Sequence, residues 1–398
     1  MGRAVGIVAL LVLLVGCGSV PTASAPPKAD QASPTSTANQ TSASGHGSAT
    51  ASPTTAPVLF PHDSSTRPGP YAILVDLLSL PDRYAISVVA KDATVVAAQS
   101  AAKRSPVANS GGHGLDLPYV STTSTALYYL DGDSTVRALL VDGMTSDPRP
   151  TPQLDVGAGM EAAFSVSPDN KTIAVSVLDF NRTPVHVRLY TDKLVGGARR
   201  VIYESDTNYV WPVAWHGGLL VLAHAYGPYL EDVSKAAPGR DNPYWAISYH
   251  VVDPATANRV TLMGSCTPSG PLSPVGSACI QGGSIDWHGN TTSWGTRNWG
   301  SISSAASISP DGSFIAAAKP DDQQFVGFWR PDGLIATWVS GPGALDWAGW
   351  LDATDVLIAS AVNADFQPRI VPITPGPSPA RFIAARGFYA ALLPTDIS

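Results

Sequence analysis

Short runs of apolar residues alternate with turn residues over most of the chain, and two of these runs repeat each other. Residues 164–177 contain Ser-Pro-Asp-Asn, and residues 306–319 contain Ser-Pro-Asp-Gly at the same place. Pro sets φ at the second position of a type I turn, and Asn or Gly accepts a positive φ at the fourth. The small apolar residues after each turn are typical of a strand buried on both faces. Each copy therefore predicts a strand, a tight turn and a second strand.

Similar strand-like segments run from residue 71 to the end, and the pattern predicts no long amphipathic helix. Residues 71–75, 84–89 and 94–98 predict the first three strands, and Asp131-Gly132 predicts a hairpin turn. The stretches beginning at Trp215 and Trp287 share Trp-His-Gly and predict the openings of two more units. Openings roughly 40 to 50 residues apart, with four strands in each unit, are typical of β-propeller blades.

The two Ser-Pro-Asp segments, each followed by Ile-Ala, resemble the WD40-like repeat of TolB-type propellers. The resemblance extends loosely over roughly 300 residues, without the Gly-His and Trp-Asp signatures of true WD40 repeats. It implies an all-β fold in which residues 58–398 form a β-propeller of six four-stranded blades, or seven if a short blade begins at Trp287. Residues 387–393 are expected to pair with the first blade and close the ring, so that no sheet edge is left exposed.

The N-terminal segment predicts an address outside the cytoplasm. Residues 1–16 combine Arg3 with an apolar run that is too short to cross a bilayer and is typical of a secretory signal. Leu14-Val15-Gly16-Cys17 resembles the lipobox of bacterial lipoproteins, which implies that residues 1–16 are a lipoprotein signal peptide and that Cys17 carries a lipid that holds the chain on a membrane. Cleavage after Ala25, which would release a free protein, is the alternative. Residues 17–57 are rich in Ala, Ser, Thr and Pro and predict a disordered tether.

The chain has three cysteines, and two remain if Cys17 is lipidated. Cys266 and Cys279 lie in a stretch rich in Pro, Gly and Ser. A disulfide between them would contribute about 3 kcal/mol and requires an oxidising compartment. Two unpaired thiols are the alternative.

The charged residues and the motif search exclude several classes of function. Lys and Arg number 24 against 31 Asp and Glu, with a net charge of −7 and no basic cluster, which argues against a nucleic-acid partner. Gly-x-Ser-x-Gly, His-Glu-x-x-His, Walker A and dinucleotide-binding patterns are missing from the sequence. Asp131 and Asp133 flank a glycine but supply too few oxygen ligands for Ca²⁺. His216 and His288 occupy equivalent positions of the repeat and are expected to pack against turns and not to bind a metal. The sequence thus predicts no catalytic residue, no metal site and no cofactor.

Two long interruptions of the repeat, residues 224–245 and 264–300, contain the candidate binding residues. Long loops on a compact scaffold are often functional, and aromatic faces beside charges suit protein or glycan recognition. The candidate ligand-binding residues are Tyr226, Tyr229, Arg240, Tyr244, Trp245, Trp294, Arg297 and Trp299. The alternative is that these aromatic side chains pack the insertions against the blades.

The function predicted from these features is a binding or scaffold module that is anchored to a membrane through Cys17 and recognises a protein or a cell-envelope glycan. The alternative is a propeller-class enzyme, such as a polysaccharide lyase, a glycosidase or a quinone-dependent sugar oxidoreductase, with a site in the central channel. The side chains at the centre of the ring discriminate between the two. Convergent His, Arg and carboxylate groups would favour the enzyme, and small apolar side chains would count against it.

Overall fold

Antiparallel β-sheets make up all the regular secondary structure in the described part of the chain. The computed structural model describes residues 69–107, 117–140, 149–226, 246–263, 270–279, 283–294, 306–319, 322–339, 347–360, 365–373 and 380–393. These residues form twenty-seven strands and no helix. Accordingly, none of the segments that the structure describes is a helix suited to crossing a membrane.

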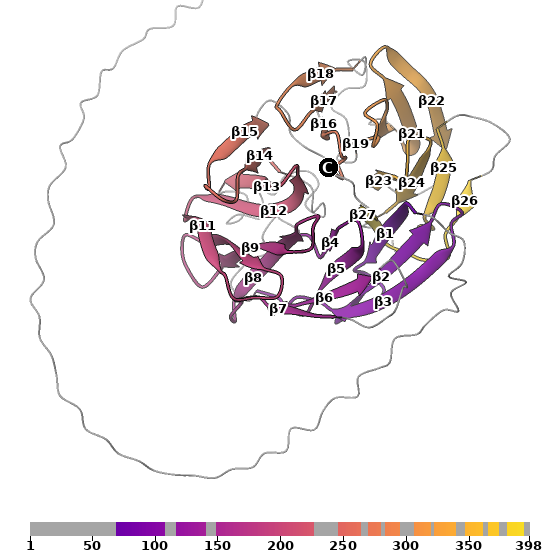
Figure 1. The fold of residues 1–398 in the computed structure, drawn as a ribbon. Helices are drawn as coiled ribbons and strands as arrows, with labels where there is room; N and C mark the ends of the chain where they lie inside the picture. Colours follow the sequence, from indigo (N-terminus) through magenta and orange to yellow (C-terminus); the bar gives the residue numbers. More distant parts are fainter. Residues whose placement is uncertain are drawn as a thin grey trace, which may run out of the picture. The chain divides into compact units, whose positions relative to one another are not determined.

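The strands form seven sheets, called blades 1 to 7 below and given from the innermost strand outward (Figure 1). Blade 1 consists of β27 (Phe388–Leu393), β1 (Tyr71–Asp76), β2 (Arg83–Ala90) and β3 (Val95–Ala102), and blade 2 of β4 (Val120–Thr122), β5 (Ala126–Asp131), β6 (Thr135–Leu140) and β7 (Arg149–Gln153). Blade 3 consists of β8 (Met160–Val166), β9 (Thr172–Asp179), β10 (His186–Lys193) and β11 (Arg200–Ser205), and blade 4 of β12 (Asn208–His216), β13 (Leu219–Tyr226), β14 (Ser248–Val252) and β15 (Arg259–Met263). Blade 5 consists of β16 (Ser277–Cys279), β17 (Gly283–Ile285) and β18 (Thr291–Ser293). Blade 6 consists of β19 (Ala306–Ile308), β20 (Ile315–Lys319), β21 (Asp322–Arg330) and β22 (Gly333–Val339), and blade 7 of β23 (Trp347–Trp350), β24 (Asp355–Ala359), β25 (Arg369–Pro372) and β26 (Arg381–Phe382).

The seven sheets form a β-propeller, which confirms the predicted fold class and resolves the number of blades to seven. Figure 1 shows the sheets around a common centre, with one strand of each nearest to it. Neighbouring inner strands contact each other around the ring, for example β4 with β8 and β8 with β12. The additional blade is blade 5, for which the structure describes three strands. Trp287 does not open this blade, because it lies in the turn between β17 and β18.

The last strand closes the ring as predicted. β27 pairs antiparallel with β1, and the register places Tyr71 opposite Leu393 and Val75 opposite Phe388. Blade 1 therefore combines one strand from the end of the described chain with three from its beginning. This pairing covers the edge of β1 that would otherwise expose unpaired N–H and C=O groups.

The hydrophobic core lies between the blades rather than in one central mass. One cluster combines buried residues of blades 7, 1 and 2, and others join blades 2 and 3, blades 5 and 6, and blades 6 and 7. Both faces of a blade are thus covered by its neighbours. This burial explains why Val356, Leu357, Ile358 and Ala359 of β24 are apolar without alternation and all buried.

The two Ser-Pro-Asp turns have the same hydrogen bonds. In the second copy the Ser309 hydroxyl donates to Asp311 Oδ1 at 2.5 Å and accepts from the N–H of Phe314 at 3.0 Å. In the first copy the Ser167 hydroxyl donates to Asp169 at 2.6 Å and accepts from a backbone N–H at 2.9 Å. The repeated Ser and Asp therefore stabilise the turn between the first and second strands of blades 3 and 6.

The fourth position of the turn differs between the copies because the neighbouring blades differ. Asn170 has φ 57° and Gly312 has φ 73°, as predicted. The Asn170 amide oxygen accepts from Thr123 Oγ1 and from the Tyr128 hydroxyl of blade 2, each at 2.9 Å. At Gly312 a Cβ atom would lie 3.3 Å from a methyl carbon of Val275, next to blade 5. Asn170 thus links two blades, and Gly312 leaves room for the next one.

Thr123 turns the chain between β4 and β5, since its hydroxyl accepts from the N–H of Ala126 at 3.2 Å. One predicted detail differs in the structure. His216 and His288 do not occupy equivalent positions, since His216 ends β12 whereas His288 lies in the turn between β17 and β18. The two sites meet instead, and the His216 ring stacks on Trp287 with centroids 5.6 Å apart.

We predict that Gly312→Ala lowers the free energy of unfolding by about 2 kcal/mol, because it adds a crowded Cβ to a positive-φ position. Gly217→Ala is the matched control, since Gly217 also has a positive φ but a Cβ there would meet nothing within 4 Å. We expect the control to lose only about 1 kcal/mol. Denaturant unfolding of both variants measures the difference, and equal losses would contradict the role of the Val275 contact.

Candidate functional site

Most of the predicted ligand-binding residues lie outside the described residues. These are Tyr229, Arg240, Tyr244, Trp245, Arg297 and Trp299, and of Tyr226 the structure describes only the backbone, at the end of β13. Trp294 is 2% exposed, and its indole N–H donates to Ser284 Oγ at 2.9 Å. Trp294 thus has the packing role that was the alternative for this group. The other members of the group stay predictions.

The cysteine predictions also fall mainly outside the described part. Cys17 and Cys266 are not described, and Cys279 is buried in β16. The lipid on Cys17 and the Cys266–Cys279 disulfide therefore stay predictions. The interruption at residues 264–300, predicted as a long loop, contains the three strands of blade 5.

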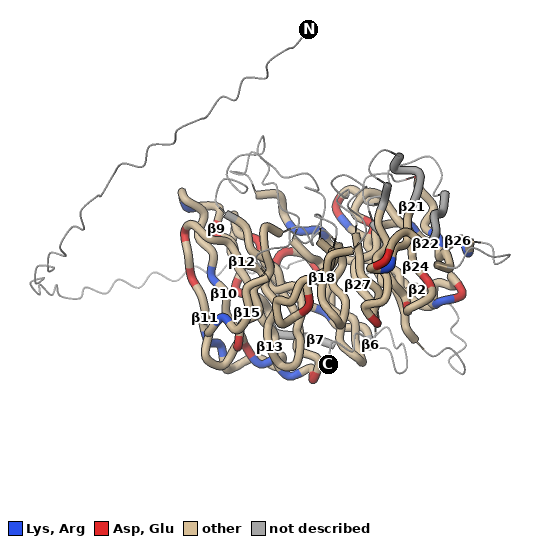
Figure 2. The backbone as a smooth tube through the Cα atoms, turned by 90° about the horizontal axis from the view of Figure 1, so that it is seen from above, with Lys and Arg blue, Asp and Glu red and all other residues tan. Residues whose placement is uncertain are grey.

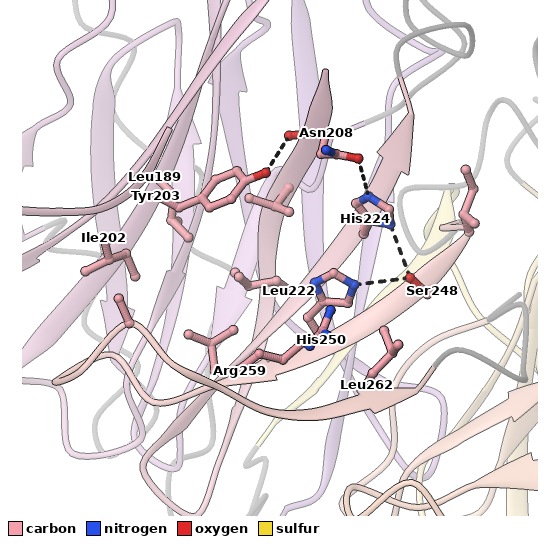
Figure 3. A pocket seen from close by; sticks show the side chains of 14 residues that line it. Leu189, Ile202, Tyr203, Asn208, Leu222, His224, Ser248, His250, Arg259 and Leu262 are labelled. Atoms are coloured by element: carbon pink, nitrogen blue, oxygen red, sulfur yellow. Dashed lines mark hydrogen bonds between the residues drawn. The ribbon is translucent and has the colours of Figure 1, made fainter. Parts of the chain in front are cut away.

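A cavity of about 570 Å³ lies between blades 3 and 4 (Figure 3). Its residues come from the two outer strands of blade 3 and from all four strands of blade 4. They are Leu189, Ile202, Tyr203, Asn208, Val210, Leu222, His224, Ile247, Ser248, His250, Val252, Ala257, Arg259 and Leu262. The volume is within the range of small-molecule sites, about 300 to 1,000 Å³. We call this cavity the blade 4 pocket.

Alternation along the strands places the polar side chains of blade 4 on the pocket face. The register pairs His224 with Ser248 and Leu222 with His250. Directly opposite residues in an antiparallel pair share a face, and so do every second residues along a strand. His224, Ser248 and His250 consequently point to the same side of the sheet.

These side chains form one hydrogen-bonded chain (Figure 3). The Asn208 amide oxygen lies 3.4 Å from His224 Nε2, and His224 Nδ1 lies 3.2 Å from Ser248 Oγ. Ser248 Oγ in turn lies 3.4 Å from His250 Nε2. An amide oxygen only accepts, so the His224 proton is on Nε2 and Nδ1 accepts from the Ser248 hydroxyl. Ser248 Oγ then accepts from His250 Nε2–H, which leaves His250 Nδ1 as an acceptor.

Both imidazoles are held neutral by their surroundings. Burial lowers the pKa of His250 to about 4, with further contributions from His224 and from the positive charge of Arg259. Burial and Arg259 also lower the pKa of His224. The two rings stack with centroids 4.8 Å apart, so protonating one disfavours protonating the other. At neutral pH the pocket therefore has one positive charge, on Arg259.

The Ser–His chain favours positioning over nucleophilic catalysis. Ser248 is buried within β14, and its two contacts with imidazole are at the long end of the hydrogen-bond range. Acyl transfer would also require donors aimed at a developing oxyanion. The arrangement is better suited to holding a neutral polar wall in a fixed orientation beside an apolar one.

The centre of the ring has different walls. A cavity of about 60 Å³ there is lined by residues of the inner strands β4, β8, β12 and β27 and by a few neighbouring residues, mostly small, apolar or Pro. Among the described residues that line it there is no His, Lys, Arg, Asp or Glu. No group of three or more potential metal ligands occurs in the described part of the chain. The described walls of this cavity thus consist of uncharged side chains.

Two histidines in apolar strands are the sequence signal for the blade 4 pocket. His224 in β13 and His250 in β14 each interrupt an apolar strand with a polar side chain. Their proximity depends on the β13–β14 register, which spans the connection at residues 227–245. Without that register the two histidines are simply two of the eight in the chain.

Comparison with known proteins assigns no family to this chain. No family model and no curated protein matches the chain. Among solved structures, an oligogalacturonate lyase in complex with manganese is 9% identical, with 73% of this chain and 68% of that chain covered and a TM-score of 0.35. The C-terminal WD40 domain of Sif2 is 12% identical, with 66% and 72% covered and a TM-score of 0.39. Neither similarity assigns a ligand or a reaction to this chain.

We predict that His250 titrates with a midpoint at about pH 4 in NMR spectra of its imidazole. Because this pKa is below the value of about 6.5 in an unfolded chain, the stability gained by keeping His250 neutral is complete above pH 6.5 and is lost as the pH falls toward 4.

Arg259→Gln should raise the midpoint of His250, since it removes a positive charge that disfavours the imidazolium. Arg182→Gln is the control, because Arg182 is exposed and does not line the pocket. A wild-type midpoint near 6.5 would contradict the burial of this ring.

Proposed function

We propose that this chain is a membrane-anchored binding module that recognises a protein or glycan of the cell envelope through the blade 4 pocket and the connection beside it. The pocket is the observation on which the proposal rests. It combines a volume of about 570 Å³ with an apolar wall, a hydrogen-bonded polar wall and one cation. A few oriented polar groups in an apolar cavity are typical of specific ligand sites.

The position of the pocket supports the sequence-based choice of the middle blades. The connection from β13 to β14 contains the candidate residues Tyr229, Arg240, Tyr244 and Trp245. Its described ends are next to the pocket, because Tyr226 pairs with Asn208 and Ala246 precedes Ile247. The two strands that this connection joins therefore both line the pocket.

The enzyme alternative has less support. A lyase, glycosidase or quinone-dependent oxidoreductase of the propeller class was expected to use the centre of the ring, and the described walls of the central cavity are uncharged. Figure 2 shows the Lys and Arg positions interspersed with the Asp and Glu positions along the described backbone. Recognition by a shaped pocket fits this surface better than attraction by a broad field of one sign.

We predict that photocrosslinking from the rim of the pocket captures the partner. Leu262 is 47% exposed and lines the pocket, and Phe382 is 55% exposed on blade 7. The photoreactive residue p-benzoylphenylalanine at position 262 should give a discrete adduct with envelope proteins or glycans, and the same residue at position 382 should not. Equal adducts at both positions, or none at position 262, would contradict recognition at this pocket.

We predict that Cys17 holds the chain on the membrane. Metabolic labelling with an alkyne fatty acid should label the wild-type chain in the membrane fraction, whereas Cys17→Ser should be unlabelled. If the mature N-terminus follows Ala25 and the wild-type chain remains unlabelled, the released form is correct and the anchor is not. Crosslinking at position 262 is independent of this result.

A further inference from the structure

The described residues that line the blade 4 pocket include no acidic side chain, although the chain as a whole is acidic. None of the fourteen described residues that line it is Asp or Glu, whereas the chain has 31 acidic residues against 24 basic ones. Arg259 is the one Lys or Arg among these lining residues. The local charge is therefore opposite in sign to the net charge.

A β-bulge brings Arg259 to the pocket. The register of β14 and β15 pairs His250 with Leu262 and Val251 with Thr261, then shifts so that Val252 faces Arg259 instead of Val260. Without the shift, Val260 would share the pocket face with Val252, and Arg259 would point to the other side. Bulges commonly re-aim a side chain in this way. The bulge thus places Arg259 on the pocket side of the outermost strand, where the residue is exposed.

Arg188, Arg199 and Arg200 of blade 3 have partners, whereas Arg259 has none among the residues that the structure describes. Arg188 and Arg199 form ion pairs with Asp155 at 2.6 and 3.0 Å, and Arg200 donates to the carbonyl of Ala255. No hydrogen bond or ion pair of Arg259 occurs with the residues that the structure describes. Figure 3 shows its side chain running along the pocket toward His250. The guanidinium can accordingly receive an anion without breaking a contact with the described residues.

The rest of the pocket provides an apolar surface for the body of such a ligand. Leu189, Val210, Leu222 and Val252 belong to one hydrophobic cluster between blades 3 and 4, and Ile202 packs against it. The same residues line the cavity. An apolar group bound here would lose its contact with water, and its position would be fixed by the charged group at Arg259.

We propose that the blade 4 pocket binds a small amphiphilic carboxylate, with the carboxylate on the Arg259 guanidinium and an apolar chain or ring against Leu222, Val210 and Ile202. This inference rests on the proposed function and names the ligand class of the same site. The carboxylate can belong to a group that a partner inserts into the pocket or to a free small molecule. A guanidinium matches the two oxygens of a carboxylate with two parallel N–H donors. The hydrogen-bonded chain from His250 to Asn208 forms the neutral, fixed side of the pocket.

The test uses three probes that share an eight-carbon body and differ in the head group. Octanoate, 1-octanol and octylammonium are titrated calorimetrically into the full-length protein at pH 7. We expect octanoate to bind about tenfold more tightly than octanol, as a charge-assisted hydrogen bond would give, and octylammonium to bind more weakly than octanol. Equal affinity for octanoate and octanol, or no binding of octanoate, overturns the proposal.

Variants assign the preference to the pocket. Arg259→Gln should remove the preference for octanoate without weakening octanol binding, and Arg259→Lys should restore part of it because the charge is kept. Arg182→Gln, which removes an exposed charge outside the pocket, should behave as the wild type. Ile202→Trp should fill the pocket and abolish binding of both probes. A preference that survives in Arg259→Gln, or octanoate binding that survives in Ile202→Trp, overturns the proposal.

The outcome separates this inference from the proposed function. If position 262 crosslinks a partner but octanoate does not bind, the carboxylate assignment is wrong and recognition at the pocket stands. If octanoate binds with the expected dependence on Arg259 but position 262 gives no adduct, the pocket takes a free small molecule, and recognition of an envelope protein or glycan is wrong.

Discussion

The pairing of β27 with β1 is the constraint on which the ring depends. The register from Tyr71–Leu393 to Val75–Phe388 joins segments at opposite ends of the described chain. Without it, blade 1 would lack its inner strand, and the apolar side chains that blades 7 and 2 share with blade 1 would be exposed. The closing contacts are close: a Cβ on Gly349 of blade 7 would lie 2.2 Å from the Tyr389 ring, whose hydroxyl donates to the carbonyl of Trp350 at 2.9 Å.

The sequence predicted features whose cause is local. Ser167 and Ser309 make the same turn hydrogen bonds in both copies, so the repeated motif identified two blades and the strands on each side of their turns. The closing strand was also predictable, because an unpaired edge is costly and residues 387–393 were the last apolar segment. In these cases the residues that determine the structure are close together in the sequence or follow from the requirement of closure.

Features determined by neighbouring blades could not be predicted in this way. The strands of blade 5 have three residues each, too few to show an alternating pattern, and small residues are required there: a Cβ on Gly283 would lie 2.5 Å from the carbonyl oxygen of Thr292. The blade 4 pocket depends on the β13–β14 register and on a bulge that changes which residue faces Val252. The secondary-structure propensities of single residues predict neither the β13–β14 register nor the bulge, because both depend on how strands pair across their connections.

The geometry of a ring of sheets explains why the pocket lies toward the outer strands and not at the centre. Blades are closest at their inner strands, where β8 contacts β12, and they diverge outward. Filling the space between two blades therefore requires more side-chain volume at the outer strands than at the inner ones. Between blades 3 and 4 the apolar cluster around Leu189 and Leu222 fills the inner part of this wedge. The cavity lies against this cluster, and blade 3 lines it only through its two outer strands, β10 and β11. A ligand site can therefore form between two blades while the inner strands β8 and β12 keep the close contacts that hold the ring.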